Sequence, residues 1–259
     1  MRLFACALIA GCLVPGHAGA AQTQPFLFVA SPSPQPLQGI AARVHVGVQS
    51  SSWRAPDARS LVHGLSVGLG FSPRVAFSVE TQSEMTATGR GVSVQALGQW
   101  RFVRAPASGL EGALSLGLRR EARGAEVVLA RVAAARHARN LDFGGHVALE
   151  HPLAAGRDAV DLGFGTGLSR SWGGGLRTGL ELAAEDLEGL WEPDAEGGAQ
   201  AFLGPSVALC PPARGWAVLA GGGPALLTRS GPDPSGAPRD LTPSAGYVFR
   251  IAVRLAGGC

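Results

Sequence analysis

The final stretch of the chain, residues 245–255, alternates between two kinds of side chain at every position. Its odd positions are all apolar: Ala245, Tyr247, Phe249, Ile251, Val253 and Leu255. Its even positions are mixed and include two arginines: Gly246, Val248, Arg250, Ala252 and Arg254. A period of two places the two sets on opposite faces of a β-strand. The wide apolar face must therefore meet either the core of a soluble sheet protein or the acyl chains of a lipid bilayer.

The same alternation recurs from Ile40 onward. It forms about twelve segments of about ten residues, which is the length that crosses a bilayer at a tilt. The weakest segment, residues 125–136, is rich in alanine and would also suit a short helix. No regular succession of strands and helices interrupts the series. We therefore predict an all-β fold, a closed antiparallel up-and-down transmembrane β-barrel of about 12 strands.

The predicted connections differ in length at the two ends of this barrel. If the N-terminus is periplasmic, the periplasmic turns are short, at residues 72–73, 104–108, 138–140, 171–174 and 211–214. The outer connections are mostly longer, at residues 50–59, 82–90, 120–124, 151–158, 186–198 and 224–243. Membrane barrels have this asymmetry, whereas a soluble sandwich has no physical reason to sort its loops by parity. The pattern of connections therefore favours lipid.

Residues 1–20 have the pattern of a secretory signal peptide. Arg2 supplies the positive end, residues 3–14 form an apolar run, and Ala18-Gly19-Ala20 offers small residues for cleavage near Ala20. The alternative is a lipoprotein signal, because Ile9-Ala10-Gly11-Cys12 is similar to a lipobox. Together with the barrel pattern, export predicts an outer-membrane location.

Residues 21–38 contain four prolines and form a Pro-rich lead-in to the barrel, which occupies residues 39–259. Such a segment favours extended or irregular chain. We expect it to lie in the periplasm or to sit loosely in the barrel as a plug. Removal of the signal leaves Cys210 and Cys259, both at the periplasmic end, and we predict a disulfide between them.

The inward positions of the predicted strands collect charges of both signs. The predicted lumen-lining residues are Arg43, His45, Glu80, Arg101, Glu111, Arg119, Asp142, His146, Glu150, Asp161, Arg177, Glu181, Arg250 and Arg254. These side chains either fill a narrow lumen with ion pairs or line a polar conduit for solutes.

Three of these residues, Asp142, His146 and Glu150, share one inward face. Neighbours four positions apart on a strand are separated by about 13 Å, which is too far to share one metal ion. We therefore predict no catalytic residue, no metal and no other cofactor. The net charge of +3 is small and scattered, which argues against nucleic acid as a partner.

The signal peptide, the alternating segments and the final strand, residues 247–255, resemble the Gram-negative outer-membrane β-barrel proteins. This resemblance implies surrounding lipid and lipopolysaccharide as partners, and a barrel-assembly machinery that reads the last strand. One departure is the ending Gly257-Gly258-Cys259, where the family usually has an aromatic residue. Residues 181–205 are similar to barrels without an assigned function, so the resemblance names no activity.

These features predict an integral outer-membrane protein, not an enzyme, with a structural or passive small-solute transport (porin-like) role. One alternative is a lipid-modifying hydrolase, because outer-membrane enzymes of similar architecture use a histidine, here His146, with a serine at the rim. A second alternative is a soluble exported β-sandwich that binds a ligand, in which the apolar faces would meet each other. The sequence leaves the solute and the oligomeric state open.

Overall fold

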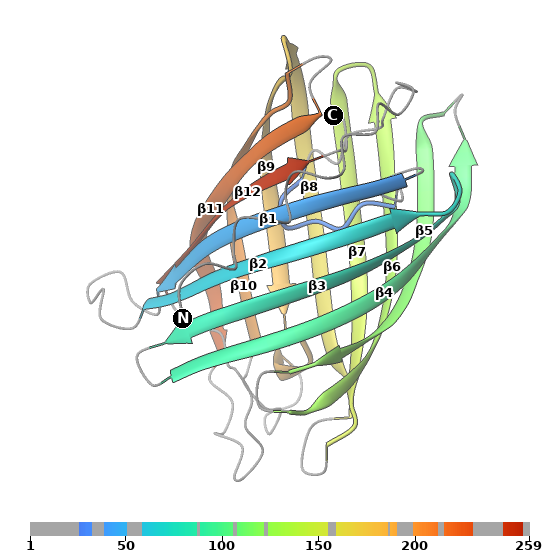
Figure 1. The fold of residues 1–259 in the computed structure, drawn as a ribbon. Helices are drawn as coiled ribbons and strands as arrows, with labels where there is room; N and C mark the ends of the chain where they lie inside the picture. The colour runs from blue at the N-terminus through green and yellow to red at the C-terminus, as the bar shows by residue number, and fades with distance from the viewer. Residues whose placement is uncertain are drawn as a thin grey trace, which may run out of the picture.

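A computed structural model gives the fold of the chain. It describes residues 26–32, 39–50, 59–86, 89–105, 108–121, 124–154, 159–185, 187–190, 199–211, 215–229 and 246–255. Twelve strands form one closed antiparallel barrel (Figure 1), so the predicted fold class and strand number are confirmed.

Each strand pairs with its neighbours in the sequence, and the first strand pairs with the last. The strands are β1 (Gly39–Ser50), β2 (Arg59–Gly70), β3 (Val75–Thr86), β4 (Gly89–Ala105), β5 (Leu110–Arg120), β6 (Glu126–Ala138), β7 (Leu141–Pro152), β8 (Asp161–Gly173), β9 (Leu176–Glu185), β10 (Ala199–Leu209), β11 (Trp216–Arg229) and β12 (Gly246–Leu255). One short 3-10 helix, η1 (Leu187–Leu190), follows β9.

Closure of the barrel depends on the alternating C-terminal stretch, which is β12. It pairs with β1 from Ala42↔Leu255 to Ser50↔Tyr247 and with β11 from Trp216↔Leu255 to Ala225↔Gly246. Because every strand is paired on both sides, no sheet edge is left with unpaired backbone groups. Only closed barrels and helices satisfy their backbone in this way within lipid.

The outer surface of the barrel is apolar around its circumference. Leu116, at a mid-strand position of β5, is 56% exposed, and Phe143, near the start of β7, is also 56% exposed, although both are large and apolar. Similar side chains point outward from the other strands, among them Val44, Leu65, Val79, Val132, Leu168 and Ile251. An apolar surface this extensive exceeds what a monomer exposes to water and matches the band that a barrel presents to acyl chains. Among the described residues, no helix is long and apolar enough to span a membrane.

The two ends of the barrel differ as expected. Three connections at one end, residues 71–74, 139–140 and 174–175, have two to four residues, and we name it the turn end. At the opposite end, which we name the loop end, the connection from β9 to β10 covers residues 186–198 and that from β11 to β12 covers residues 230–245.

One predicted outer loop is wrong. Residues 82–90 were expected to connect two strands, but β3 and β4 stay paired from Gln82↔Ser93 to Thr86↔Gly89. The reason is that backbone pairing continues where the apolar alternation stops, once the strands extend beyond the apolar band. For the same reason β11 continues to Arg229, inside the loop expected at residues 224–243. Residues 125–136, for which a short helix was the alternative, form most of strand β6.

Candidate lumen site

Residues 26–32 lie inside the barrel rather than outside it. Phe26, Leu27 and Val29 have exposed fractions of 3%, 3% and 1%. Leu27 packs in an apolar cluster with Ala208, Ala217 and other small residues of the wall, near the turn end. This part of the Pro-rich lead-in therefore occupies the lumen, as the plug alternative proposed. Residues 21–25 and 33–38 lie outside the described part of the chain.

The carboxylate of Glu181 on β9 holds this segment through its backbone. The amide of Leu27 donates to both carboxylate oxygens at 3.0 Å, Phe28 donates at 2.7 Å, and Val29 lies at 3.3 Å. Successive amides that converge on one anion form a nest, a concave site for negative charge. Hydrogen bonds to a charged group are stronger than neutral ones, at about 1.5–3 kcal/mol each. Glu181 is only 1% exposed, so water does not compete for these bonds.

Two further strands hold the other end of the segment. The amide of Ala30 donates to Nδ1 of His146 on β7 at 3.1 Å. The side-chain amide of Gln99 on β4 donates from Nε2 to the carbonyl oxygen of Ser31 at 2.7 Å. Because Nδ1 of His146 accepts a hydrogen bond, the proton of the neutral imidazole is on Nε2. The segment is therefore bound to walls on different sides of the lumen.

Two inward glycines make room for the segment. A Cβ atom added at Gly144 or at Gly167 would lie 2.7 Å from the ring of Phe26. A third glycine, Gly165, makes room for the ring of His146, which a Cβ there would approach to 2.3 Å. These inward glycines thus provide the space that the plug and its histidine partner occupy.

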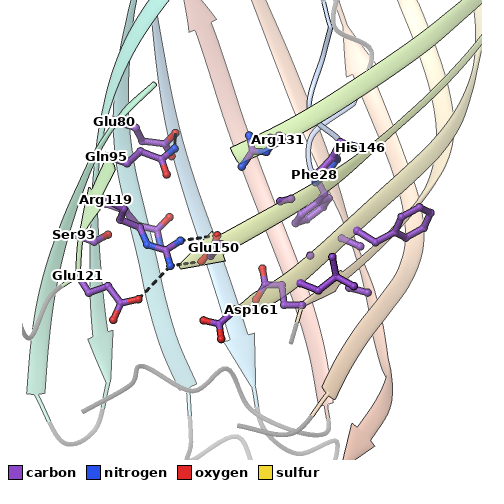
Figure 2. A pocket seen from close by; sticks show the side chains of 18 of the residues that line it. Phe28, Glu80, Ser93, Gln95, Arg119, Glu121, Arg131, His146, Glu150 and Asp161 are labelled. Atoms are coloured by element: carbon purple, nitrogen blue, oxygen red, sulfur yellow. Dashed lines mark hydrogen bonds and ion pairs between the residues drawn. The ribbon is translucent and has the colours of Figure 1, made fainter. Parts of the chain in front are cut away.

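Two adjoining cavities lie in the lumen beside the plug segment: Phe28 lines both, and residues 27–31 line one of them. The loop-side cavity has a volume of about 380 Å³, and its lining includes Ser93 and Glu121 (Figure 2). Glu185, the last residue of β9, also lines it. The turn-side cavity has a volume of about 310 Å³ and includes Ala41 and Arg43 from the start of β1. Six residues line both cavities and mark the boundary between them: Phe28, Glu80, Gln95, Arg131, His146 and Arg250.

Phe28 is the one residue of the plug segment that lines both cavities. Its ring meets Phe202 of β10 edge to face, with centroids 4.4 Å apart. The guanidinium carbon of Arg250 lies 5.0 Å from its ring centroid, within the range of a cation–π contact. The register of β10 shifts between Ala201 and Phe202, and both of these consecutive residues are buried.

The predicted lumen residues fall into two groups. Eight line one or both cavities: Arg43, Glu80, Arg119, His146, Glu150, Asp161, Arg250 and Arg254. The other six line neither cavity and are buried or paired: His45, Arg101, Glu111, Asp142, Arg177 and Glu181. Contact of any of these residues with a solute stays a prediction.

Ion pairs join many of these side chains. Arg119 donates from Nη1 to Oε1 of Glu150 at 3.0 Å and from Nη2 to Oε1 of Glu121 at 3.1 Å, as the dashed lines of Figure 2 show. Asp142 bridges His137 and Arg177 near the turn end. Each pair places opposite charges within hydrogen-bond distance, which offsets part of the cost of removing these charged groups from bulk water.

Among the ion pairs of the described residues, that of Arg101 and Glu111 is the most buried, with side chains 0% and 2% exposed and 3.2 Å between Nη1 and Oε1. Changing Glu111 to glutamine leaves the charge of Arg101 buried without its carboxylate. We expect the free energy of unfolding to fall by about 3–5 kcal/mol. Urea unfolding of the barrel in lipid vesicles, followed by tryptophan fluorescence, measures the change. Glu126→Gln, at an exposed position, is the control and should change stability by no more than about 0.5 kcal/mol. An equal loss for both variants would contradict the role of this pair.

Several residues of the lumen were not predicted. Phe28 and the acceptor Ser31 lie in a Pro-rich segment with no periodic pattern, so no sequence signal placed them in the barrel. The alternation of residues 125–136 puts Arg131 on the same inward face as Val127 and Leu129. The high alanine content of that stretch weakened the strand prediction. Glu121 follows the last residue of β5 and so lies just outside the alternation.

The histidine expected in the hydrolase alternative has a structural partner. His146 accepts the Ala30 amide at Nδ1, a bond to the plug segment rather than to a nucleophile. Within the described ranges, no group of three or more His, Cys, Asp or Glu side chains is arranged to hold a metal ion. Cys210 is buried, whereas Cys259 lies outside the described residues, so their disulfide stays a prediction.

Comparison with known proteins finds solved structures of similar fold, but it finds no protein that is similar in sequence. No protein-family model matches the chain, and no curated protein matches its sequence. Among solved structures, the chain is similar to the KdgM porin, with a TM-score of 0.55 and 8% identity over 83% of this chain and 98% of that chain. The NanC porin gives a TM-score of 0.55 and 12% identity over 83% of this chain and 98% of that chain.

A third structure extends the likeness to a channel. An outer membrane channel from Pseudomonas putida F1 matches with a TM-score of 0.57 and 9% identity over 90% of this chain and 99% of that chain. All three identities are low, so the likeness concerns the course of the backbone rather than the side chains of the lumen. The chain has the closed antiparallel barrel fold of outer-membrane porins and channels.

Proposed function

We propose that this protein is an outer-membrane channel for the passive passage of small solutes, narrowed by its own residues 26–32. The observation that carries this proposal is the pair of polar cavities that meet across one shared boundary inside a lipid-facing barrel. A barrel with a purely structural role could fill its lumen completely with paired side chains. Cavities of about 380 and 310 Å³ leave room for small solutes on both sides of the boundary.

The location and the partners belong to the same proposal. Export with cleavage near Ala20 would deliver the barrel to the periplasm, and the assembly machinery would recognise β12, which closes the barrel against β1. Phospholipid and lipopolysaccharide would then surround the apolar outer face. The similarity to porins and to a channel supports passive transport without catalysis.

Planar-bilayer recording of the purified, folded protein tests the channel. Folding is checked first by the shift in gel migration between unheated and boiled samples. We expect discrete, ohmic current steps from the folded barrel in potassium chloride, because its lumen holds charged, hydrated walls along its length. Boiled protein at the same concentration is the control. Insertion of the folded barrel without any current step would contradict a transport role and leave a structural one.

A further inference from the structure

The two cavities carry opposite balances of charge. The turn-side cavity is lined by four arginines and one carboxylate: Arg43, Arg131, Arg250, Arg254 and Glu80. The loop-side cavity is lined by three arginines and five carboxylates: Arg119, Arg131, Arg250, Glu80, Glu121, Glu150, Asp161 and Glu185. The excess positive charge is therefore confined to the turn-side cavity, where it is surrounded by a wall of low polarisability.

Two of its arginines are placed against each other. Arg43 of β1 and Arg254 of β12 are directly paired across the two strands and lie on the same inward face. Directly opposite residues have Cβ atoms about 5 Å apart, and like charges in such positions repel each other. Arg254 is also only 4% exposed, so bulk water screens this repulsion poorly. A bound anion between or beside the two guanidinium groups would turn this cost into attraction.

The remaining walls of the cavity are suited to an oxyanion. Arg250 lies on the same inward face of β12, four residues before Arg254, and its guanidinium lies over the ring of Phe28. On the far wall, the buried Nε of Arg131 has no hydrogen-bond partner in the described structure. Hydroxyl groups of Ser66, Ser78 and Ser115 complete the lining. The planar guanidinium fork matches the oxygen geometry of carboxylate and phosphate groups, which can accept two bonds from it.

We propose that the turn-side cavity is a binding site for a small oxyanion, that is, a solute with a carboxylate or a phosphate group. The inference rests on the proposed channel function and deepens it by naming the class of solute held in the lumen. A volume of about 310 Å³ lies at the lower end of small-molecule sites, which fits one such group with a short remainder. The excess of carboxylates in the loop-side cavity repels the same solute, so the site is reached more readily from the turn end.

Equilibrium dialysis with radiolabelled inorganic phosphate tests the site without requiring any current. The folded barrel is held in a neutral detergent at low ionic strength. We expect saturable binding near one phosphate per barrel, competition by acetate, and loss of binding as sodium chloride is added. Arg43→Gln and, separately, Arg254→Gln should each lower the affinity by about tenfold or more, because each removes a charge-assisted contact.

Arg119→Gln is the matched control, because it removes the same charge from the loop-side cavity, where Arg119 contacts Glu150 and Glu121. Its affinity for phosphate should stay within about twofold of the unchanged protein. Absence of saturable binding, or an equal loss in all three variants, overturns the inference. Only variants that show the heat-dependent shift in gel migration are compared. If Arg254→Gln fails to fold, Arg43→Gln still tests the site, because Arg43 is only half-buried. Current steps without phosphate binding would overturn this inference alone, whereas phosphate binding without current would overturn the channel and leave the site.

Discussion

Deleting residues 26–32 is expected to raise the single-channel conductance by a factor on the order of three, since the narrowest cross-section limits ion flow. Phe28 of this segment lines both cavities, and residues 27–31 line the turn-side one. We expect that without the segment the two cavities form one wider polar lumen. Planar-bilayer recordings of the deleted and the unchanged barrel, made in the same salt, give the comparison.

A point variant tests whether release of residues 26–32 from their site is enough, without removing them from the chain. Glu181→Gln keeps the shape of the side chain but removes the charge that receives the amides of Leu27, Phe28 and Val29. We expect larger and more variable current steps, because the segment then leaves the boundary for part of the time. Glu150→Gln removes the same charge from the lumen wall at a position that pairs with Arg119, and it should leave the step size near that of the unchanged barrel. Equal steps for the deleted and the unchanged barrel would mean that residues 26–32 do not limit the flow.

Arginine on the outer face is expected to destabilise the barrel according to its depth in the membrane. Leu116→Arg places a charge at a mid-strand position of β5, and we expect it to lower the free energy of unfolding by about 2–4 kcal/mol. Leu110→Arg, on the same face at the first residue of β5, should cost about 0–1 kcal/mol, because it lies near the interface with water. Urea unfolding from lipid vesicles measures both.

The two leucines share a strand, a face and a substitution, so only depth differs between them. Leu116 is 56% exposed and Leu110 is 43% exposed, so neither change opens a cavity in a packed core. A soluble protein would tolerate an exposed arginine equally well at both positions. Similar small effects at Leu110 and Leu116 would therefore argue that water, not lipid, surrounds this face.

The strands of the barrel could be predicted from the sequence because their side chains alternate between two environments. Each residue of a strand faces either lipid or lumen, and the two environments select different side chains at alternate positions. For this reason β12 and its inward residues Arg250 and Arg254 could be read from the chain alone. The same rule failed between Gln82 and Arg90, where the strands extend past the apolar band and the selection for apolar residues ends.

The contents of the lumen could not be predicted in the same way. The bond between Glu181 and the amides of residues 27–29 joins positions more than 150 apart in the chain. Every residue except proline has a backbone amide, so the sequence does not show which amides bind a carboxylate. Glu181 is also one of several carboxylates at inward strand positions. The inward glycines Gly144 and Gly167 were visible, but that they make room for Phe26 follows only from the folded barrel.

The most direct test of the account is whether the mature chain requires lipid. Purified protein is folded in the presence of phospholipid vesicles, washed with alkaline carbonate and floated on a density gradient. We expect the protein to rise with the vesicles after the wash and to show the heat-dependent shift in gel migration. A chain that stays monomeric and folded in plain buffer, and remains at the bottom of the gradient, would show that its apolar faces do not meet acyl chains.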